Sequence, residues 1–477
     1  MRWSPEEIAT ITGGVVRVRS GRTVHTAFID SRRPVRDGLF VPIVAARDGH
    51  EFIPAAIDGG AAAVLLGRGR PLPLGSTSSA GSPAKASVIE VEDPLRALEA
   101  LAMDARARCP GPVVAISGSN GKTTTRAMVA AVLGSAYNPV LCTKGNLNNH
   151  LGVPLTLTDG PEDPQVMVIE LGMSAPGENQ HLAALVRPTH AVITSIALEH
   201  LEFMGSIEAI AAAEAEPIAE VIDGGALVYP GDEPLLAPHI PVAGDGRGLV
   251  LRPFGGGEGG TVRVVGVELG ERTTAILEVA LPSGGHERLR PRLKVFGAHN
   301  ARNAAAALAV GVDLGLPLAA MCEALEGVEP VGDRGRLIFA GGHSIIADCY
   351  NSNPGSVAVA LRSLAGLRGQ VSGSLVAVLG DMLELGPTEK VLHAEVGALV
   401  QELGIDSLIT VGERAREMAA SAARGGVAVT AFAADAEPKA IAGMARQLLG
   451  AQPGAVLFKG SRGVRLERAL AALQAEL

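Results

Sequence analysis

Short apolar runs recur along the chain, and most of them end in a cluster of glycine, asparagine and charged residues. Runs bounded by turn residues in this way are typical of buried strands in a parallel sheet. In the middle of the chain they cover residues 112–117, 165–170 and 190–196, and a helical pattern follows the first from Lys122 to Leu133. The pattern predicts a central parallel sheet with helical crossovers.

The C-terminal third repeats this alternation. Apolar runs separated by helical patterns predict a βαβ series, and therefore a second parallel sheet. The predicted strands are residues 344–350, 374–380, 406–411, 427–432 and 455–459.

The N-terminal part predicts a smaller unit of the same class. Strands are expected at residues 26–32, 38–43 and 62–66, with a helix from Asp48 between the last two. Residues 69–85 are rich in Pro, Gly and Ser, which predicts a flexible surface loop.

Three further patterns complete the prediction. A helix from Pro94 to about Arg108 links the first unit to the central one, residues 262–295 alternate as antiparallel strands do, and an alanine-rich helix begins near residue 296. We therefore predict an α/β protein of three domains: a small α/β domain (residues 1–95), a central P-loop ATPase-like domain with a parallel sheet (96–328) and a C-terminal Rossmann-like domain (329–477).

Composition narrows the class of partner. The 477 residues include 41 basic and 50 acidic side chains, a net charge of −9, so the basic surface of a DNA- or RNA-binding protein is absent from the sequence. Aromatic residues are only 3%, which disfavours stacking on single-stranded nucleic acid. There is no membrane-spanning run or signal-peptide pattern, and the four cysteines lack metal-site or disulfide spacing. We expect a cytoplasmic monomer that does not insert into membranes.

The strongest chemical signal is the stretch Gly-Ser-Asn-Gly-Lys-Thr from Gly118 to Thr123. It follows a buried strand and opens a helix, so backbone N–H groups and the positive end of the helix dipole meet at one point. Lys122 adds a full charge, and Thr123 offers a hydroxyl to Mg²⁺. A standard P-loop has another glycine five residues before Gly121, where this chain has Ile116. An ordinary strand–turn–helix crossover is the alternative, but the combination favours ATP.

Other polar residues follow predicted strands, where ligands bind in open α/β sheets. Glu170 ends one strand and His200 follows another, so both are candidate metal ligands, although a single histidine is more often structural. Residues 143–149 form either a loop near the phosphates or a polar turn. Asn300 and its neighbours lie where asparagine commonly caps a helix. Arg32, with Ser31, either holds an anionic or uracil-like group or belongs to a solvated turn.

Taken in order, these clusters resemble the Mur ligase family of ATP-dependent amide-forming enzymes, in which the short P-loop is typical. Further matching blocks are Thr143–Asn149, Glu170–Gly172, His200–Glu202 and Gly297–Asn303. One branch of the family joins D-alanyl-D-alanine to UDP-N-acetylmuramoyl-tripeptide in peptidoglycan synthesis. Three blocks resemble that branch specifically: Tyr350–Pro354, Gly380–Gly386 and Lys459–Arg462. The resemblance covers nearly the whole chain.

The resemblance implies one domain for the UDP end of the acid substrate, one for ATP and one for the incoming amine. It implies that ATP phosphorylates the carboxylate, and that the amine attacks the acyl phosphate to give an amide, ADP and phosphate. The implied catalytic residues are Lys122, Glu170, His200 and Glu214. The implied Mg²⁺ ligands are Thr123, Glu170 and, for a second ion, His200.

The resemblance also implies binding residues. Those for the nucleotide are Gly118, Ser119, Asn120, Gly121, Lys122, Thr123, Thr124, His299, Asn300, Arg336 and Asp348. Those for the UDP-linked acid and the amine are Ser31, Arg32, Asn146, Asn149, Asn351, Asn353, Lys459 and Arg462.

Glu214 departs from the family pattern. The family usually has a lysine there, modified to a carbamate that helps to bind the second metal ion. The carboxyl carbon of glutamate lies about 3–4 Å nearer the backbone, so direct ligation would need a backbone shift and a bridging water is easier. Glu214 is therefore either a carbon-dioxide-independent replacement or a charge on the helix surface, with a weakened metal site.

Smaller departures occur at Ser195, Ser352 and Gly463-Val464, and residues 40–48 are one residue short. They leave two alternatives open. One is a paralogue that joins a different amine to a UDP-linked or other acid. The other, suggested by Glu214, is a catalytically impaired nucleotide-binding partner.

Overall fold

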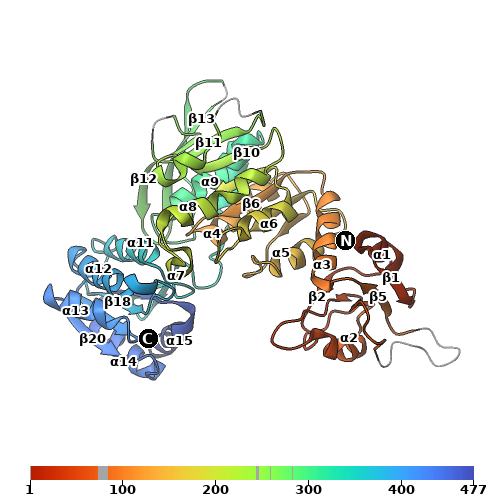
Figure 1. The fold of residues 1–477 in the computed structure, drawn as a ribbon. Helices are drawn as coiled ribbons and strands as arrows, with labels where there is room; N and C mark the ends of the chain where they lie inside the picture. Colours follow the sequence, from red (N-terminus) through yellow and green to blue (C-terminus); the bar gives the residue numbers. More distant parts are fainter. Residues whose placement is uncertain (1, 74–83, 243–245, 258, 282) are drawn as a thin grey trace.

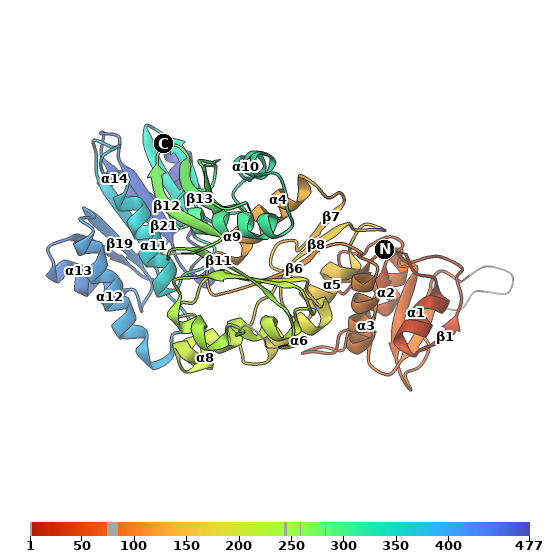
Figure 2. The same ribbon diagram turned by 90° about the horizontal axis from the view of Figure 1, so that it is seen from above.

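The chain forms three sheets that follow one another along the sequence, each flanked by helices. The computed structural model describes residues 2–73, 84–242, 246–257, 259–281 and 283–477, so residues 74–83 of the predicted loop lie outside the described residues. Figures 1 and 2 show the central domain between the other two, and in Figure 1 the three domains form an arch. The predicted α/β class with three domains is confirmed.

The N-terminal domain has a five-stranded sheet in the order β1-β5-β4-β3-β2, in which only the β1–β5 pairing is antiparallel. The strands predicted at residues 26–32 and 38–43 are present but reduced to two residues each. The helices and strands are α1 (Pro5–Thr12), β1 (Val15–Val18), β2 (Ala27–Phe28), β3 (Leu39–Phe40), α2 (Ile53–Asp58), β4 (Ala63–Gly67) and β5 (Ser87–Val91).

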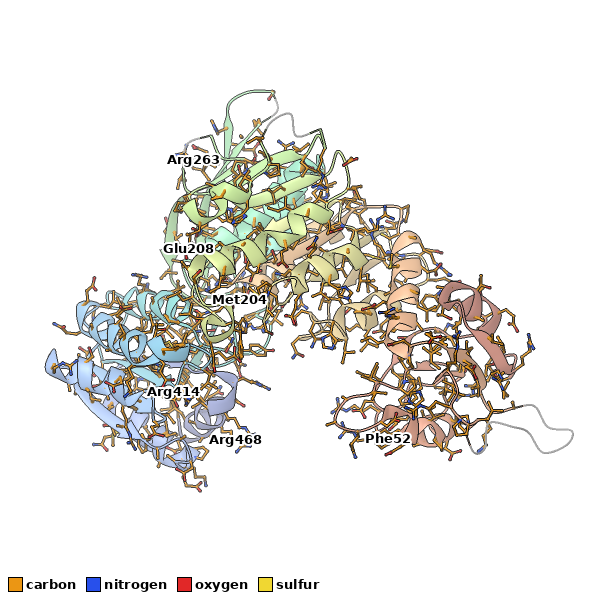
Figure 3. The ribbon with its side chains drawn as sticks, viewed as in Figure 1. Phe52, Met204, Glu208, Arg263, Arg414 and Arg468 are labelled. Carbon is orange, nitrogen blue, oxygen red and sulfur yellow. The ribbon has the colours of Figure 1, made fainter. Side chains whose placement is uncertain are left out.

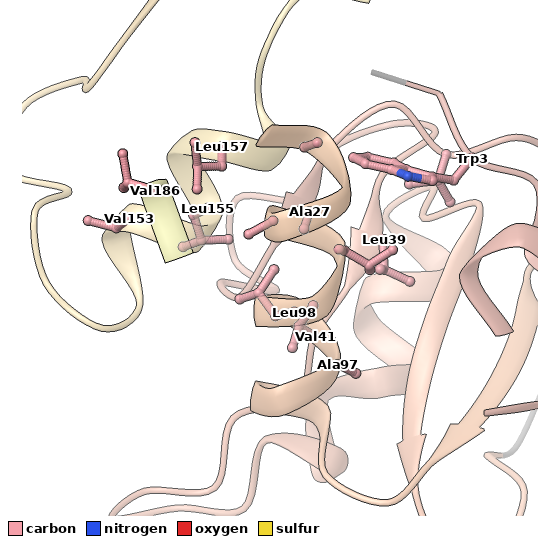
Figure 4. Close-up of a cluster of buried hydrophobic side chains, with 14 of the residues drawn as sticks. Trp3, Ala27, Leu39, Val41, Ala97, Leu98, Val153, Leu155, Leu157 and Val186 are labelled. Atoms are coloured by element: carbon pink, nitrogen blue, oxygen red, sulfur yellow. The ribbon is translucent and has the colours of Figure 1, made fainter. Parts of the chain in front are cut away.

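Helix α3 (Pro94–Ala107) connects this domain to the central one and packs against both. One continuous apolar cluster contains Trp3 and Leu39 from the N-terminal domain, Leu98 from α3, and Leu155 and Val186 from the central domain (Figure 4). Asp93 caps the helix by accepting hydrogen bonds from its first turn. The boundary predicted between residues 95 and 96 falls in this first turn. Because α3 packs against both domains, they share a core and are not joined by a flexible linker.

The central domain has a ten-stranded sheet in the order β14-β13-β12-β11-β10-β9-β6-β8-β7, with β15 paired to β13. Its parallel part runs from β7 to β12. The elements are β6 (Val113–Ser117), α4 (Lys122–Gly134), β7 (Val140–Cys142), α5 (Gly152–Thr158), β8 (Val166–Glu170), α6 (Glu178–Val186), β9 (His190–Ile193), α7 (Leu201–Met204), α8 (Ile207–Ala215), β10 (Ala226–Pro230), β11 (Val250–Gly255), β12 (Val262–Leu269), β13 (Thr273–Ala280), β14 (His286–Leu289), β15 (Arg292–Leu293), α9 (Asn300–Asp313) and α10 (Leu318–Glu326).

The antiparallel strands predicted at residues 262–295 are present. They extend the parallel sheet through β11, which pairs with β12. Strands β10 and β11 were not predicted, because Pro230 and Pro253 argue against interior strand positions. The alanine-rich helix α9 is almost wholly buried between α4 and the sheet, where small side chains permit close packing.

The C-terminal domain has a six-stranded sheet in the order β16-β17-β21-β18-β19-β20, parallel except for the β16–β17 pair. The five predicted strands are confirmed, and β16 is additional. The elements are β16 (Arg336–Ala340), β17 (His343–Ala347), α11 (Pro354–Ala365), β18 (Leu375–Gly380), α12 (Glu389–Glu402), β19 (Ser407–Val411), α13 (Arg416–Arg424), β20 (Ala428–Phe432), α14 (Pro438–Leu449), β21 (Ala455–Lys459) and α15 (Glu467–Glu476). None of the described helices in any domain combines the length and apolar character needed to cross a bilayer.

The core shared across α3 generates a prediction about Trp3, the single tryptophan of the chain. Its indole is buried, and Nε1 donates a hydrogen bond of 2.8 Å to Oδ2 of Asp104 on α3. We expect Asp104→Ala to lower the free energy of unfolding of the N-terminal domain by about 1–3 kcal/mol, because a buried donor loses its acceptor. Urea unfolding followed by tryptophan fluorescence measures this directly.

Two variants control this experiment. Asp104→Asn keeps an acceptor and should lose less stability, and Arg96→Ala, at an exposed position on α3, should be neutral. An unchanged unfolding midpoint for Asp104→Ala would contradict the prediction.

Candidate active site

The order of strands in the central sheet brings the predicted site residues together. Strand β6 lies between β8 and β9, with Ile116 opposite Glu170 and Ser117 opposite Ile193. The loop after β6 therefore has the end of β8 on one side and the segment after β9 on the other. Both neighbours supply acidic side chains to the loop.

The loop at residues 118–121 is held by contacts that require glycine at two positions. Gly118 has φ 114° and Gly121 has φ 87°. A Cβ on Gly118 would stand 2.2 Å from Oγ1 of Thr194, and one on Gly121 would stand 2.6 Å from Oδ1 of Asn303. Ser195 accepts a hydrogen bond from the amide of Asn120 at 3.1 Å, so this departure from the family pattern still closes the loop.

Lys122 begins α4 and points back across the loop. Its ammonium donates to the carbonyl of Gly118 and lies 3.6 Å from Oε1 of Glu199 and 3.7 Å from Oε1 of Glu214. Burial alone would lower the pKa of Lys122, but the carboxylates of Glu199, Glu214 and Glu170 outweigh it and hold the pKa above its usual value. Lys122 is therefore a full positive charge at the site.

Glu199, which directly precedes His200 in the sequence, is a further residue of the cavity lining. Desolvation raises the pKa of Glu199 to about 8, against the lowering effect of Lys122 and with a further increase from Glu214. In the described part of the chain, Oε1 of Glu199 and Oε1 of Glu214 are both buried without a hydrogen-bond partner. Such atoms are expected where a cationic ligand group is missing.

Glu214 is not a charge on a helix surface. Its side chain is 1% exposed, and Oε2 accepts hydrogen bonds from the amide of Gly118 at 2.7 Å and from Nδ2 of Asn179 at 3.0 Å. The alternative of a solvated surface glutamate is wrong, because α8 packs this side chain against the phosphate-binding loop. The carboxylate reaches Gly118 and Lys122 without any rearrangement of the backbone.

Glu170 ends β8 beside the first turn of α4. Its Oε1 accepts hydrogen bonds from Oγ1 of Thr123 at 3.2 Å and from Nδ2 of Asn148 at 3.0 Å. Its Oε2 is buried and lacks a hydrogen bond within the described residues, with Nε of Arg126 at 3.6 Å. Asn148 and Arg126 are site residues that the sequence analysis missed; position 148 lies inside the predicted loop, but its orientation could not be read from the sequence.

The donor set at Glu170 fits Mg²⁺. Carboxylate and hydroxyl oxygens are hard ligands, and Mg²⁺ is usually held by one or two carboxylates together with phosphates and water. Among the described residues, no group of three or more His, Cys, Asp or Glu side chains is placed to hold a metal ion.

A cavity of about 660 Å³ joins these residues to the C-terminal domain. The predicted site residues that line it are Ser119, Asn120, Gly121, Lys122, Thr123, Thr124, Asn146, Asn149, Glu170, His200, His299, Asp348, Asn351, Asn353 and Lys459. Glu170 and His200 thus share a cavity with Lys122, as predicted. Asn149 also accepts hydrogen bonds from the amides of Leu151 and Gly152 at the start of α5, so it has a capping role as well.

The start of α9 differs from the prediction. Asn300 is fully buried, its Nδ2 donates to the carbonyl of Phe296 and its Oδ1 accepts from Asn303, so its side chain is engaged away from the cavity lining. His299 and Asn303 line the cavity instead. Burial lowers the pKa of His299 to about 4, so the ring is neutral near pH 7, and its Nδ1 is buried without a described hydrogen-bond partner. Asn300 supports the helix start.

Arg334 lines the cavity, whereas the predicted Arg336 does not. The guanidinium of Arg334 stacks on the ring of Tyr350 at 3.7 Å from its centroid, and Arg334 lines the cavity. Arg336 begins β16, is exposed and pairs with Asp333 at 2.8 Å. Arg334 and Arg336 are two residues apart in the sequence. Because β16 was not predicted, the sequence did not show which of the two points toward the cavity.

The C-terminal domain contributes a second charged pair. Lys459 is 2% exposed, and its Nζ donates to Oδ2 of Asp348 at 2.7 Å and to the carbonyl of Asn351 at 3.1 Å. Asn353 donates to Oδ1 of Asn120 at 3.0 Å, which ties the phosphate-binding loop to this domain. Arg462 is exposed and lies over Tyr350, 5.4 Å from the ring centroid, outside the lining of the cavity.

Ser31 and Arg32 lie in the N-terminal domain and do not belong to the cavity lining. Arg32 is exposed and pairs with Asp30 at 2.9 Å, and this hydrogen-bonded pair lowers the pKa of Asp30 to about 2. The structure thus brings the predicted nucleotide and metal residues together and keeps the predicted uridine-diphosphate residues in a separate domain.

Comparison with known families agrees with this geometry. The model for the Mur ligase middle domain matches residues 116–311, and the model for the Mur ligase, glutamate ligase domain matches residues 333–462. The two matches correspond to the central domain, with its phosphate-binding loop, and to the C-terminal domain that completes the cavity.

Curated relatives match nearly the whole chain. The UDP-N-acetylmuramoyl-tripeptide–D-alanyl-D-alanine ligase of Bacillus subtilis (strain 168) is 36% identical, over 93% of this chain and 92% of its own. The ligase of the same name from Escherichia coli (strain K12) is 31% identical, over 95% and 94%.

Solved structures extend the similarity to the fold. A crystal structure of MurF from Acinetobacter baumannii has a TM-score of 0.84 and 28% identity, and covers 100% of this chain and 99% of its own. A crystal structure of MurF ligase from Thermotoga maritima in complex with ADP has a TM-score of 0.78 and 25% identity, over 95% and 98%.

The contacts of the phosphate-binding loop generate a prediction. Gly118→Ala should reduce ADP affinity at least about tenfold, because the new Cβ would collide with Thr194 and strain a backbone with positive φ. Isothermal titration with ADP and Mg²⁺ measures the effect. Gly134→Ala, at the exposed end of α4 with the nearest atom 3.8 Å away, is the matched control and should bind normally. Equal ADP affinities for the two variants would refute the assignment.

Proposed function

The chain belongs to the Mur ligase family, and we propose that it joins D-alanyl-D-alanine to UDP-N-acetylmuramoyl-tripeptide, with cleavage of ATP to ADP and phosphate, in peptidoglycan precursor synthesis. The observation that carries the proposal is the cavity that the phosphate-binding loop and the C-terminal domain line together. An ATP-dependent ligase needs such a site, because it must hold a nucleotide and two further substrates at one point.

The phosphate-binding loop supplies the first part of the chemistry. A carboxylate is a poor acylating agent, so its oxygen first attacks the γ-phosphate of ATP to form an acyl phosphate. Two negative groups must approach each other in this step. The amides at the start of α4 and the ammonium of Lys122 lie where they offset the repulsion.

Thr123 and Glu170 would hold the first Mg²⁺ and His200 a second, with the Glu214 carboxylate in the place of the family's carbamate. Bound there, Mg²⁺ would neutralise phosphate charge and orient the γ-phosphate. The buried carboxylate oxygens without hydrogen bonds support this assignment, since an uncompensated buried acid is unfavourable.

The two-domain lining of the cavity supports the second step. The amine of D-alanyl-D-alanine attacks the acyl carbon, phosphate leaves, and the amide forms. Acyl phosphates hydrolyse readily, so water has to be excluded while they exist. The contact between Asn353 and Asn120 closes the C-terminal domain over the phosphate-binding loop and supports that role.

The remaining assignments follow from where the residues lie. We assign Ser31 and Arg32 to the uridine diphosphate, Asn146 and Asn149 to the acid substrate near the phosphates, and Asn351, Lys459 and Arg462 to the amine side of the cavity. His299, Asn303 and Arg334 are the residues whose placement best suits the nucleoside. We expect the protein to act as a monomer in the cytoplasm; its four cysteines are free thiols, which supports a reducing compartment.

Phosphate release tests the proposal. With ATP, Mg²⁺, UDP-N-acetylmuramoyl-tripeptide and D-alanyl-D-alanine, we expect multiple turnovers that depend on all four. Lys122→Met should lower kcat/KM by roughly a hundredfold or more, because it removes the charge nearest the transferred phosphate. A panel of other dipeptides and UDP-linked acids runs in parallel.

Two other outcomes would each replace the proposal. Turnover only with a different amine or acid would identify a paralogue with another substrate. Tight ATP binding without turnover on any pair would identify a nucleotide-binding partner that has lost catalysis.

Glu214 generates a separate prediction about carbon dioxide. Because this carboxylate needs no carbamylation, activity should be the same in buffers depleted of bicarbonate and supplemented with it. Glu214→Gln should raise the Mg²⁺ concentration for half-maximal turnover about tenfold. Glu214→Lys should make turnover respond to added bicarbonate, since a lysine there can form the family's carbamate.

Glu208→Gln is the matched control for Glu214→Gln. Glu208 is an exposed residue of the same helix α8, as Figure 3 shows, and its replacement should leave the Mg²⁺ dependence unchanged. If Glu214→Gln behaves like Glu208→Gln, the carboxylate is not a substitute for the carbamate.

A further inference from the structure

The imidazole ring of His200 contacts the C-terminal domain. Its Nδ1 lies 2.5 Å from Oε2 of Glu384, which belongs to the loop between β18 and α12. The two residues are 184 positions apart in the sequence, so only the docking of the C-terminal domain on the central domain brings them together. Figure 3 shows Met204, at the end of the short helix α7 that follows His200, at the border between these two domains.

Both residues have a backbone conformation that is unfavourable for a residue with a Cβ. His200 has φ 49° and Glu384 has φ 63°. The described non-glycine residues with positive φ are Asp37, Arg187, His200, Glu384 and Arg465, so two of the set form this one contact. Conformations of this kind persist when surrounding contacts hold them, and they concentrate at functional sites.

The surrounding contacts hold the pair from the main chain as well. The amide of Glu202 donates to the carbonyl of Glu384 at 3.1 Å. A Cβ on Gly386 would stand 3.3 Å from Cα of Glu202, so the two loops are in close contact there. These contacts fix both the distance and the orientation of the two side chains, so that the Glu384 carboxylate lies against Nδ1 of His200.

The choice of nitrogen has a chemical consequence. A carboxylate accepts the proton of Nδ1, so the neutral ring keeps its lone pair on Nε2. Histidines that bind metal ions are commonly oriented in this way, with a carboxylate on the ring nitrogen that does not face the metal. His200 lines the cavity that also contains Lys122 and Glu199.

We propose that Glu384 is a positioning residue that holds His200 in the tautomer and orientation needed to bind a divalent cation, and that it does so only while the C-terminal domain is docked. The proposal rests on the proposed function, because it takes His200 as a cation ligand. It adds that the cation site is incomplete in any open arrangement of the two domains. Phosphate transfer from ATP is thereby linked to the closure that excludes water.

The alternative for this pair is a simple docking contact. Half-exposed ion pairs contribute little to stability, and here the Glu384 side chain is 48% exposed. A docking contact would affect the closure of the domains but not the affinity for the cation once they are closed. The test must therefore measure the cation directly, and not through turnover alone.

Mn²⁺ binding in the presence of ADP, followed by electron paramagnetic resonance, provides that measurement. In the full-length protein we expect Glu384→Ala to weaken the site that His200→Ala also weakens, by about 10- to 100-fold. Glu384→Gln should lose less Mn²⁺ affinity, because its amide oxygen still accepts a hydrogen bond from Nδ1 of His200. Glu395→Gln, an exposed residue on α12 of the same domain, is the matched control and should bind Mn²⁺ as the unaltered protein does.

Two further measurements separate the possible failures. ADP affinity without a divalent cation should be unchanged in Glu384→Ala, since the phosphate-binding loop is intact, and small-angle scattering reports domain closure. If Glu384→Ala opens the domains but binds Mn²⁺ normally, Glu384 is a docking residue and the inference is wrong. If His200→Ala itself binds Mn²⁺ normally, the cation assignment is wrong and the inference falls with it, while the ligase reaction is judged separately by turnover of the unaltered protein.

Discussion

The site depends on buried acidic side chains at the carboxyl edge of the central sheet. Glu170, Glu199 and Glu214 converge on the phosphate-binding loop, and each has an oxygen without a hydrogen bond within the described residues. Burying acids is strongly unfavourable unless cations compensate them. Lys122 and Arg126 do so in part, at 3.6–3.7 Å. Under the proposed function, a cation that enters with the nucleotide would stabilise a site built in this way.

This arrangement depends on contacts that cross between domains. Asn353 reaches the loop residue Asn120, and Glu384 reaches His200, so two loops of the C-terminal domain end at the nucleotide cavity. The central domain alone provides the loop, Thr123 and Glu170, but not the whole lining. Dividing one site between two domains lets a single motion assemble the site and exclude water.

Sequence reasoning succeeded where local chemistry is strong. The apolar strands, the glycines around Lys122 and the polar residues at strand ends predicted the α/β class, and they predicted that Glu170 and His200 share a cavity with Lys122. It failed where the role of a residue depends on the direction in which its side chain points. Asn300 and Asn303 are three residues apart on one helix, and only packing against Phe296 shows which of them is engaged elsewhere. The burial of Glu214 depends on how α8 packs against the loop, which periodicity does not encode.

Helix α3 fixes the N-terminal domain to the central domain. It joins the N-terminal and central domains through one shared core. The separation between the phosphate-binding loop and Arg32 therefore depends on this packed core. If Arg32 and the phosphate-binding loop hold the two ends of one acid substrate, as proposed above, the shared core sets the length of acid that can reach both. We then expect selection by length without recognition of the intervening side chains.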